Sequence, residues 1–480
     1  MKTPFLGGGY VGRQRELVNN RCVNLFPELV ETKEGKDVGA LYNCPGFYLL
    51  ATCGKGPVRE AYVASNGLLY VVSGNTLYSV AANWVVTALG TVNSSSGYAK
   101  MVDNGTQLMV IDGTGGWCLT FATSAFVQVL PAGLGVVPTS LAFQDGFALV
   151  NDAGTNAWYQ SNLNDFTTWQ ALNFSSADST PFNVTALFDI HREVWLFKSD
   201  VTEVWINAGL PGFAFQRLQG VQMPTGCTAP ASIDRIGDTI VWLGSDPQGQ
   251  GVVYMSNGYS AVPISTHYIN LQIQAMSRID DAIGYTYQEA GHQFYVLTFP
   301  TGNKTFVYDN ATRWWHERAA FSPQTNQFSR HQGNCFAFAY GTYVIGDFAS
   351  GNLYALSMTT YTDNGAPRKW LRSWRALPHD QQSFAPLRFN SLQIDCMTGI
   401  DIPDGTDAQF ILRYSDDGGY NWSNEMWTDG NQTGATTSRV IFQRLGTTKR
   451  GQGTDRYSEL SGVDPVPQCL IGADLDVEPA

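Results

Sequence analysis

Apolar and polar residues alternate in short runs along most of the chain, and tight-turn sequences separate these runs. In residues 63–80, VASNGLLYVVSGNTLYSV, an alternating run lies between Asn66-Gly67 and Ser73-Gly74. Asn-Gly is a strong hairpin signal, because both central residues of a type I′ turn need a positive φ. The segment therefore predicts three short strands joined by two turns.

The same order of strands and turns returns further along the chain. Asn104-Gly105 stands 38 residues after Asn66-Gly67, and Asp145-Gly146 marks a third copy. Looser copies follow, with turn anchors at residues 67, 105, 146, 191, 237, 291 and 341, spaced 38 to 54 residues apart. A period of roughly 40–50 residues with three or four strands is typical of β-propeller blades, which bury their faces against one another.

We therefore predict an all-β fold with a β-propeller-like region of six or seven blades over residues 56–360. A set of β-sandwich domains would also give regularly spaced strands, but the repeated order of strands and turns favours the propeller. After residue 361 turn-forming residues and Pro interrupt the repeat, and DAQFILRYSDDGG then resumes the alternation of apolar and polar residues. Residues 361–480 are therefore expected to form a C-terminal β-sandwich.

The first 55 residues are polar, aperiodic and rich in Asn, Gly and Pro. They are predicted to form an extended N-terminal arm, because their composition offers too little apolar surface to fold alone. The short apolar stretches LFPEL and CPGFYLL would anchor this arm on a neighbouring subunit or on the C-terminal domain.

Composition agrees with many short strands and argues against a nucleic-acid-binding surface. Aromatic residues make up 13% and charged residues 15% of the chain, whereas long amphipathic helices would need more Glu, Lys and Arg. The formal net charge is -12. The densest basic stretch, RKWLRSWR at residues 368–375, is expected to be a solvated strand or linker face, so most of the surface should repel DNA.

No targeting, membrane or metal signal stands out. The N-terminus lacks the apolar run of a signal peptide, and nowhere do about 18 apolar residues run together. The eight cysteines form no C-x-x-C and the six histidines show no ligand spacing, so no cofactor and no metal are expected. Asp401, Asp404 and Asp407 could in principle hold a cation, but a polar turn is favoured. His191 and His316 stand beside aromatic residues and are expected to be packed or half-exposed histidines.

The stretch YSDDGGYNWS at residues 414–423 fits the Asp-box pattern S-x-D-x-G-x-x-W through Ser415, Asp417, Gly419 and Trp422. In such a hairpin the Asp side chain caps backbone donors of its own turn, the Gly supplies a positive φ and the Trp packs beneath. This chemistry stabilises a turn, although the motif also occurs in sialidases. We predict a structural Asp-box and no catalytic residues.

A glycan-cleaving role needs more than this hairpin. A sialidase would require an arginine cluster, a Tyr nucleophile backed by Glu and an acidic Asp, and the F/Y-R-I-P strand that usually brings the first arginine is absent. Other glycosidases need two carboxylates that face a cleft, for which Asp401 with Asp404 is a candidate pair. GYSAV at residues 258–262 lacks the second glycine of a nucleophile elbow. A glycan-binding or glycan-hydrolysing tail protein with a sialidase-like propeller remains the alternative.

Several motifs resemble one family in the order in which that family carries them. RYSDDGGYNWSNEMW, SRVIFQRLGTTKRGQG and CLIGADLDVE resemble the C-terminal end of the tail hub proteins of short-tailed bacteriophages, also known as packaged-DNA stabilisation proteins, tail accessory factors or nozzles. RCVNLFPE (21–28), LYNCPGF (41–47) and the stretch 239–266 resemble its front and central motifs. GTTKRGQGTD (446–455) departs from the family pattern.

The resemblance implies a non-enzymatic protein of the virion tail, synthesised in the host cytoplasm. Several copies, usually six, would close a homohexameric ring beneath the portal and its adaptor or connector protein. Such a ring continues the DNA channel, retains the packaged genome, conducts it during ejection, and carries needle, fibre or spike proteins. DNA would pass through the lumen without sequence-specific binding, which suits an acidic wall. A cytosolic propeller scaffold without a phage link is a third possibility.

Overall fold

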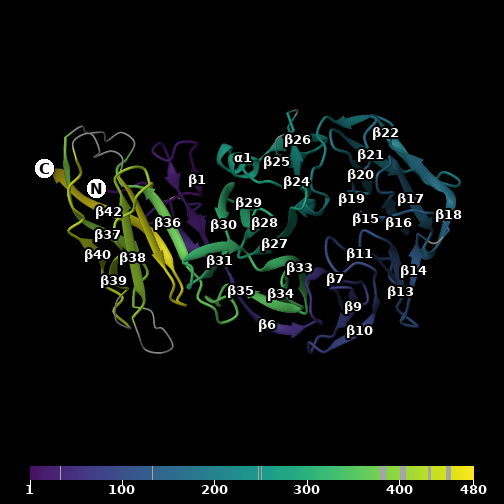
Figure 1. Ribbon diagram of the computed structural model, residues 1–480, viewed down its shortest axis with the longest axis horizontal. Coiled ribbons are helices and arrows are strands. Elements are labelled where there is room, and N and C mark those ends of the chain that lie inside the picture. The colour runs from purple at the N-terminus through teal and green to yellow at the C-terminus, as the bar shows by residue number, and fades with distance from the viewer. Residues whose placement is uncertain are drawn as a thin grey trace.

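The protein is known from a computed structural model that describes residues 1–480 except 33, 132, 247, 250, 379–384, 400–406, 431–433 and 450–455. A ring of small sheets and a two-sheet sandwich lie side by side along the longest axis of the molecule (Figure 1). Strands make up nearly all of the regular structure, so the all-β prediction is confirmed. Within the described residues the helical elements are α1 (His267–Gln274) and the 3-10 helix η1 (Pro230–Ser232).

The ring consists of seven antiparallel four-stranded units in the described part of the chain, here called blades 1 to 7. Blades 1 to 3 comprise β7 (Val58–Val63), β8 (Leu69–Ser73), β9 (Thr76–Val80) and β10 (Val86–Thr91); β11 (Lys100–Asp103), β12 (Gln107–Ile111), β13 (Gly116–Thr120) and β14 (Ala125–Leu130); and β15 (Leu141–Gln144), β16 (Phe147–Asn151), β17 (Ala157–Asn162) and β18 (Asp165–Ser176). Blades 4 and 5 comprise β19 (Ala186–Ile190), β20 (Glu193–Phe197), β21 (Thr202–Asn207) and β22 (Phe215–Met223), and β23 (Asp234–Ile236), β24 (Thr239–Ser245), β25 (Gly251–Asn257) and β26 (Ser260–Pro263).

Blades 6 and 7 involve segments from elsewhere in the chain. Blade 6 comprises β27 (Ile283–Glu289), β28 (His292–Phe299), β29 (Lys304–Asp309) and β30 (Trp314–Glu317). Blade 7 comprises β33 (Gly333–Ala339), β34 (Thr342–Asp347) and β35 (Asn352–Ser357), and its outer strand is β6 (Gly46–Thr52). The ring is thus closed by a strand that precedes blade 1, since β6 pairs antiparallel with β35.

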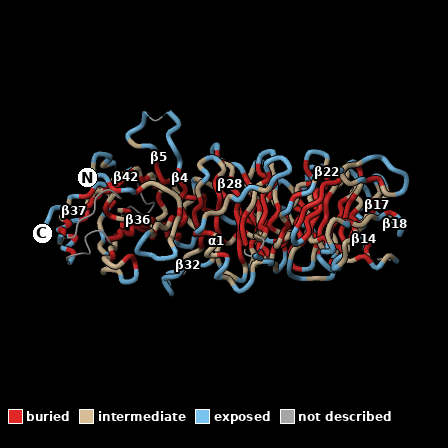
Figure 2. The backbone as a smooth tube through the Cα atoms, turned by 90° about the horizontal axis from the view of Figure 1, so that it is seen from above, coloured by how far each residue is buried: buried red, intermediate tan, exposed pale blue. Residues whose placement is uncertain are grey.

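Local turn chemistry and burial between blades explain the ring. The glycines of the predicted hairpin turns have the required backbone, with φ of +81° at Gly67, +92° at Gly105 and +88° at Gly146. Apolar side chains of neighbouring blades share a core, and the cluster that contains Val71 of blade 1 and Val344 of blade 7 completes the circuit. Buried residues accordingly follow the strands, while the connections on both faces are exposed (Figure 2).

The second part is a β-sandwich. One sheet continues blade 6 through β3 (Cys22–Val23), β36 (Trp370–Arg375), β41 (Tyr457–Gly462), β38 (Gln409–Ser415) and β39 (Met426–Asp429). The facing sheet has the order β4 (Leu25–Leu29), β5 (Gly39–Asn43), β42 (Cys469–Pro479), β37 (Leu387–Cys396) and β40 (Val440–Gln443). The small pairs β1 (Tyr10–Val11) with β2 (Asn19–Asn20), and β31 (Ala319–Ser322) with β32 (Gln327–Arg330), complete the strands.

Residues 1–55 therefore contribute strands to both parts of the molecule. LFPEL is strand β4 of the sandwich, and CPGFYLL contains most of β6 of the ring. Phe5 is 1% exposed in the sandwich core, where its ring meets Trp374 edge-on at 4.8 Å between centroids. The first residues are also hydrogen-bonded to β42, since the Thr3 amide donates to the Ala473 carbonyl at 2.9 Å.

The basic stretch 368–375 differs from its predicted environment. We expected a solvated face, but Arg368 and Lys369 are each 6% exposed and Arg372 is fully buried, so that expectation is wrong. The Arg372 guanidinium donates to the carbonyl oxygens of Phe5 at 2.8 Å and Gly8 at 3.2 Å. The N-terminal segment thus supplies the acceptors that a buried guanidinium needs.

Candidate functional site

The Asp-box lies in the connection between β38 and β39, which pair as an antiparallel hairpin in the sandwich. Asp417 Oδ1 accepts hydrogen bonds from the backbone amides of Tyr420 at 3.0 Å and Asn421 at 2.9 Å, and from the Ser415 hydroxyl at 2.7 Å. Its Oδ2 accepts from Asn421 Nδ2 at 2.6 Å. All of these donors belong to the turn itself, so the carboxylate acts as a local cap.

Charge and hydrogen bonding at Asp417 are consistent with this capping. Burial raises the pKa of Asp417, but the hydrogen bonds from Asn421, Ser415 and Tyr420 outweigh it and hold the pKa at about 2. A carboxyl group held ionised in this way cannot donate a proton near neutral pH, as a general acid must.

The Asp-box turn also contacts the N-terminal segment. Asn19 Nδ2 donates to the Gly418 carbonyl at 3.2 Å. Gly419 has a φ of +93°, and a Cβ placed there would lie 2.0 Å from Asn19 Nδ2. The backbone conformation at 419 therefore favours glycine, and a side chain there would also displace the Asn19 amide from its hydrogen bond to Gly418. Trp422 is half-buried, and the Arg413 guanidinium lies 5.4 Å from its ring centroid.

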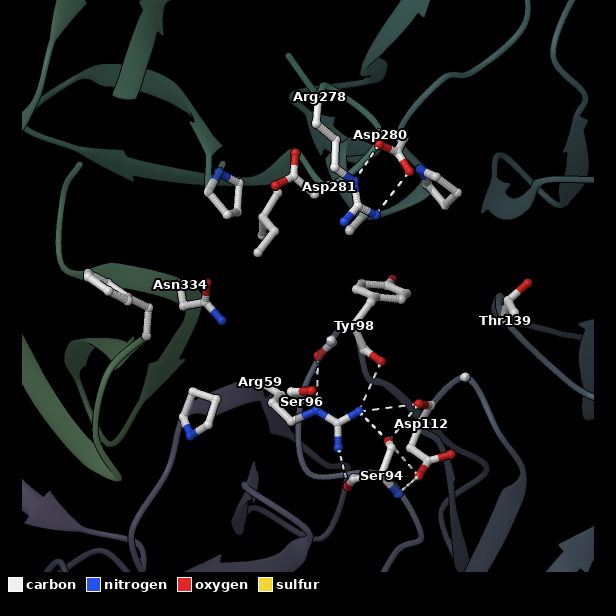
Figure 3. Close-up of a pocket in the computed structure, with 18 of the residues that line it drawn as sticks. Arg59, Ser94, Ser96, Tyr98, Asp112, Thr139, Arg278, Asp280, Asp281 and Asn334 are labelled. Atoms are coloured by element: carbon white, nitrogen blue, oxygen red, sulfur yellow. Dashed lines mark hydrogen bonds and ion pairs between the residues drawn. The ribbon is translucent and has the colours of Figure 1, made fainter. Parts of the chain in front are cut away.

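A second candidate is the cavity of about 570 Å³ at one mouth of the ring. It is lined by segments that precede or begin the first strands of several blades, including Pro57, Tyr98, Thr139 and Asn334 (Figure 3). Arg59 is 4% exposed there and donates to the carbonyl oxygens of Gly97 and Ser94, both at 2.9 Å. Arg59 of β7 thus holds the connection between blades 1 and 2 in place through hydrogen bonds.

The carboxylates of this mouth are bonded to neighbouring donors. Asp112 accepts from the Ser94 amide at 2.6 Å, and although burial raises its pKa, the Ser94 and Thr114 hydrogen bonds lower it overall. Asp280 is paired with Arg278 at 2.7 Å, which lowers its pKa (Figure 3). These two groups have the low pKa of structural carboxylates, whereas a glycosidase acid needs a raised one.

Charged groups on the first strands of four blades interact electrostatically. Lys100 of β11 lies 3.8 Å from Glu60 of β7, and Coulomb interactions connect Lys100 to Asp189 of β19 and Asp234 of β23. Burial raises the pKa of Glu60 to about 7 and also raises that of Asp234, and the nearby Lys100 ammonium only partly offsets this effect. This cluster links four blades electrostatically.

His316, His191 and Asp407 do not line these sites. His316 is buried in the core beside Phe294, and burial keeps its pKa well below the usual value. His191 is exposed in the β19–β20 turn with a φ of +53°. Asp407 is half-buried, and Asp401 and Asp404 lie outside the described residues. Within the described residues, no group of three or more His, Cys, Asp or Glu side chains could hold a metal ion. No helix in the described chain has the length and apolar character to span a membrane.

Solved structures align with the chain at low similarity. The N-terminal domain of Nup159 aligns with a TM-score of 0.43 and 10% identity, covering 70% of this chain and 98% of that one. The Pan2 WD40 domain of Neurospora crassa aligns with a TM-score of 0.41 and 10% identity, covering 65% and 95%. No curated protein sequence matches the chain.

Family models match nearly the whole chain. The model described as bacteriophage P22 Gp10, beta-propeller, matches residues 1–361, and the model described as bacteriophage P22 Gp10, beta-sandwich, matches residues 369–457. Both the order and the type of the two parts agree with the ring and the sandwich of the structure. The chain therefore belongs to the bacteriophage P22 Gp10 family, the tail hub or packaged-DNA stabilisation proteins of short-tailed phages.

Proposed function

We propose that this chain is the non-enzymatic tail hub, or nozzle, of a short-tailed phage and that it closes into a homohexameric ring on the DNA axis. The ring continues the channel of the portal and its adaptor, retains the packaged DNA and conducts it during ejection. The observation that carries the proposal is the family match to residues 1–361 and 369–457. One repeated interface in closed cyclic symmetry is sufficient to build such a conduit.

The charge of the chain supports a conduit that does not hold DNA. The formal net charge is -12, and the densest basic stretch is used inside the protein, where Arg372 is fully buried. Firm binding to duplex DNA requires clustered, accessible Lys and Arg that release counterions. We expect Asp and Glu to dominate the lumen wall, so that DNA slides past with few phosphate contacts to break.

The hydrogen bonding of three carboxylates, those of the Asp-box and the ring mouth, supports a role without catalysis. Asp417 is saturated by donors of its own turn, and Asp112 and Asp280 in the ring mouth bind Ser94 and Arg278. In this proposal the adaptor binds one end of the ring of subunits, and needle, fibre or spike proteins bind elsewhere on it.

Cryo-electron microscopy of assembled tails tests the placement. The expected map has six copies of this chain around the DNA axis, directly below the adaptor. A map in which the chain forms no ring on this axis, or occurs only at the fibre tips, would refute the proposal. In a gel-shift assay at low salt, the purified chain should not slow the migration of duplex DNA.

Two further measurements separate the hub from the glycan-cleaving alternative. Phage particles that lack this chain should package DNA but then release it. The measurement is the fraction of phage DNA that becomes sensitive to added nuclease. Purified protein incubated with host surface glycans should release no reducing sugar. Release by the wild type that disappears in Asp417→Asn would instead establish the glycosidase.

A further inference from the structure

A cleft of about 380 Å³ lies where the N-terminal segment, blade 6 and the sandwich meet. The Asp-box turn forms part of its wall through Gly419 and Trp422, and Tyr268 of α1 forms another part. Six charged side chains line the cleft: Arg15, Arg21, Lys304, Glu317, Arg413 and Glu459.

Both carboxylates of the cleft already have cationic partners. Arg21 donates through Nε at 3.3 Å and Nη2 at 3.0 Å to the two oxygens of Glu317, which also accepts the Tyr268 hydroxyl at 3.1 Å. Arg413 Nε donates to Glu459 at 3.0 Å, and its Nη2 forms a close ion pair with the same oxygen. Burial raises the pKa of Glu317, but the attraction of Arg21 more than offsets this and lowers the pKa overall. The Glu317 carboxylate is therefore ionised, and Arg21 balances its charge.

Two cations of the cleft form no ion pair with any residue that the structure describes. Lys304 Nζ contacts the amide oxygen of Gln272, and the exposed Arg15 guanidinium lies 5.7 Å from the ring centroid of Tyr420 in the Asp-box turn. Burial lowers the pKa of Lys304, and the attraction of the Glu317 carboxylate, which is already paired with Arg21, only partly offsets this. The cleft thus holds an excess of two positive charges in a chain whose net charge is -12.

The chemistry of the cleft fits separate carboxylates better than a nucleic acid. Arg21 binds the two oxygens of Glu317 through two nitrogens, the paired geometry that guanidinium groups favour for carboxylates. A phosphodiester strand needs a basic track along its length, and Glu317 and Glu459 interrupt any such track here. The half-buried Trp422 offers a flat apolar face against which the methylene groups of a peptide can pack.

We propose that this cleft binds the carboxylate side chains of an acidic peptide segment of another protein, with Lys304 and Arg15 as the anchoring cations. The site is assembled only when the N-terminal segment lies against both the ring and the sandwich, since Arg15 and Arg21 come from that segment. This inference concerns a binding site of the folded chain and does not depend on the tail role.

Fluorescence anisotropy with labelled peptides tests the site on the full-length protein at low salt. A fluorescein-labelled peptide of alternating Gly and Glu pairs should bind, and the same peptide with Gln for Glu should bind at least about tenfold more weakly, because its neutral side chains cannot form charge-assisted hydrogen bonds with Lys304 and Arg15. The double variant Arg15→Gln/Lys304→Gln should weaken binding of the Glu peptide by about tenfold or more.

The matched control is Arg13→Gln/Lys55→Gln, which removes the same charge from exposed positions outside the cleft. It should weaken binding far less than the cleft variant, since neither Arg13 nor Lys55 lines the cleft or can contact a peptide bound in it. Melting curves of all variants check folding, and Arg15→Gln alone, at an exposed position, should still weaken binding. Absence of peptide binding, equal losses in cleft and control variants, or tighter binding of a single-stranded oligothymidylate than of the Glu peptide would each overturn the proposal.

Discussion

Replacing Asp417 by asparagine tests whether the Asp-box carboxylate is a structural cap. The carboxylate accepts four hydrogen bonds, two from backbone amides and two from the side chains of Ser415 and Asn421. An asparagine can place its oxygen at the position of Oδ1 and keep the two amide donors as neutral bonds. Its NH₂ group then meets the Asn421 NH₂ group, so that the bond at Oδ2 is lost.

The size of the effect follows from these bonds. A hydrogen bond to a charged group contributes about 1.5–3 kcal/mol and a neutral one about 0.5–1.5 kcal/mol, and the half-exposed position reduces both. We expect Asp417→Asn to lower the free energy of unfolding by about 1–2 kcal/mol and Asp417→Ala by about 2–4 kcal/mol. Urea unfolding followed by tryptophan fluorescence measures both values.

The pH dependence gives a second, independent readout. The pKa of Asp417 is about 2 in the folded protein and about 3.9 in an unfolded chain. A lowered carboxyl pKa stabilises the fold above the unfolded value, and this contribution is lost as the pH falls through the folded value. The stability difference between wild type and Asp417→Asn should therefore be constant above about pH 5 and shrink between about pH 4 and pH 2.

The control for this experiment is Asp238→Asn. Asp238 is exposed and takes part in a surface ion pair with Arg235, which contributes about 0–1 kcal/mol. Equal stability changes in the two variants, or no change in Asp417→Asn at neutral pH, would refute the capping argument. Unchanged stability with loss of a sugar-releasing activity would refute the structural role altogether.

Three further changes test the fold. Gly419→Ala should destabilise the protein more than Gly365→Ala, because both glycines have a positive φ but only at 419 would the new methyl group meet Asn19; urea unfolding of the two variants compares them directly. The melting temperature of Glu60→Gln relative to that of wild type should rise as the pH increases from 5 to 8. The pKa of Glu60, raised to about 7 in the folded protein, makes the wild type lose stability in this window, and the variant lacks this group. An equal dependence of melting temperature on pH in both proteins would contradict the argument. Phe5→Ala should cost about 3–5 kcal/mol in urea unfolding, since the ring is buried in the sandwich core, and a loss below about 1 kcal/mol would show that the first residues do not contribute to it.

The sequence predicted those features that depend on local chemistry. Asn-Gly and Asp-Gly pairs indicated the blade turns because a positive φ is a requirement of one residue, and the structure has that φ at Gly67, Gly105 and Gly146. The Asp-box could be recognised for the same reason, since Asp417 bonds to donors within four residues of itself. The propeller and sandwich types follow from the repetition of such local signals.

Features that depend on distant pairing could not be predicted in this way. The burial of Arg372 depends on carbonyl oxygens of Phe5 and Gly8, more than 360 residues away in sequence. The outer strand of blade 7 comes from residues 46–52, whose polar and aperiodic surroundings gave no sign of a propeller strand. The charged cleft was missed for the same reason, because Arg15, Lys304 and Arg413 converge only in the folded chain.

The N-terminal segment joins the ring and the sandwich. Val23 of β3 pairs with Glu317 of blade 6 on one side and with Leu371 of the sandwich on the other, so a single sheet runs through both parts.

Asn24 reinforces this connection, since its buried side-chain amide donates to the carbonyls of both Ala319 and Lys369 at 2.8 Å. Each of these bonds is shielded from water and unavailable to either part alone, so separating the ring from the sandwich would leave buried polar groups unpaired. The ring and the sandwich are therefore joined by paired backbone and buried hydrogen bonds rather than by a flexible linker, so they should unfold together rather than one after the other.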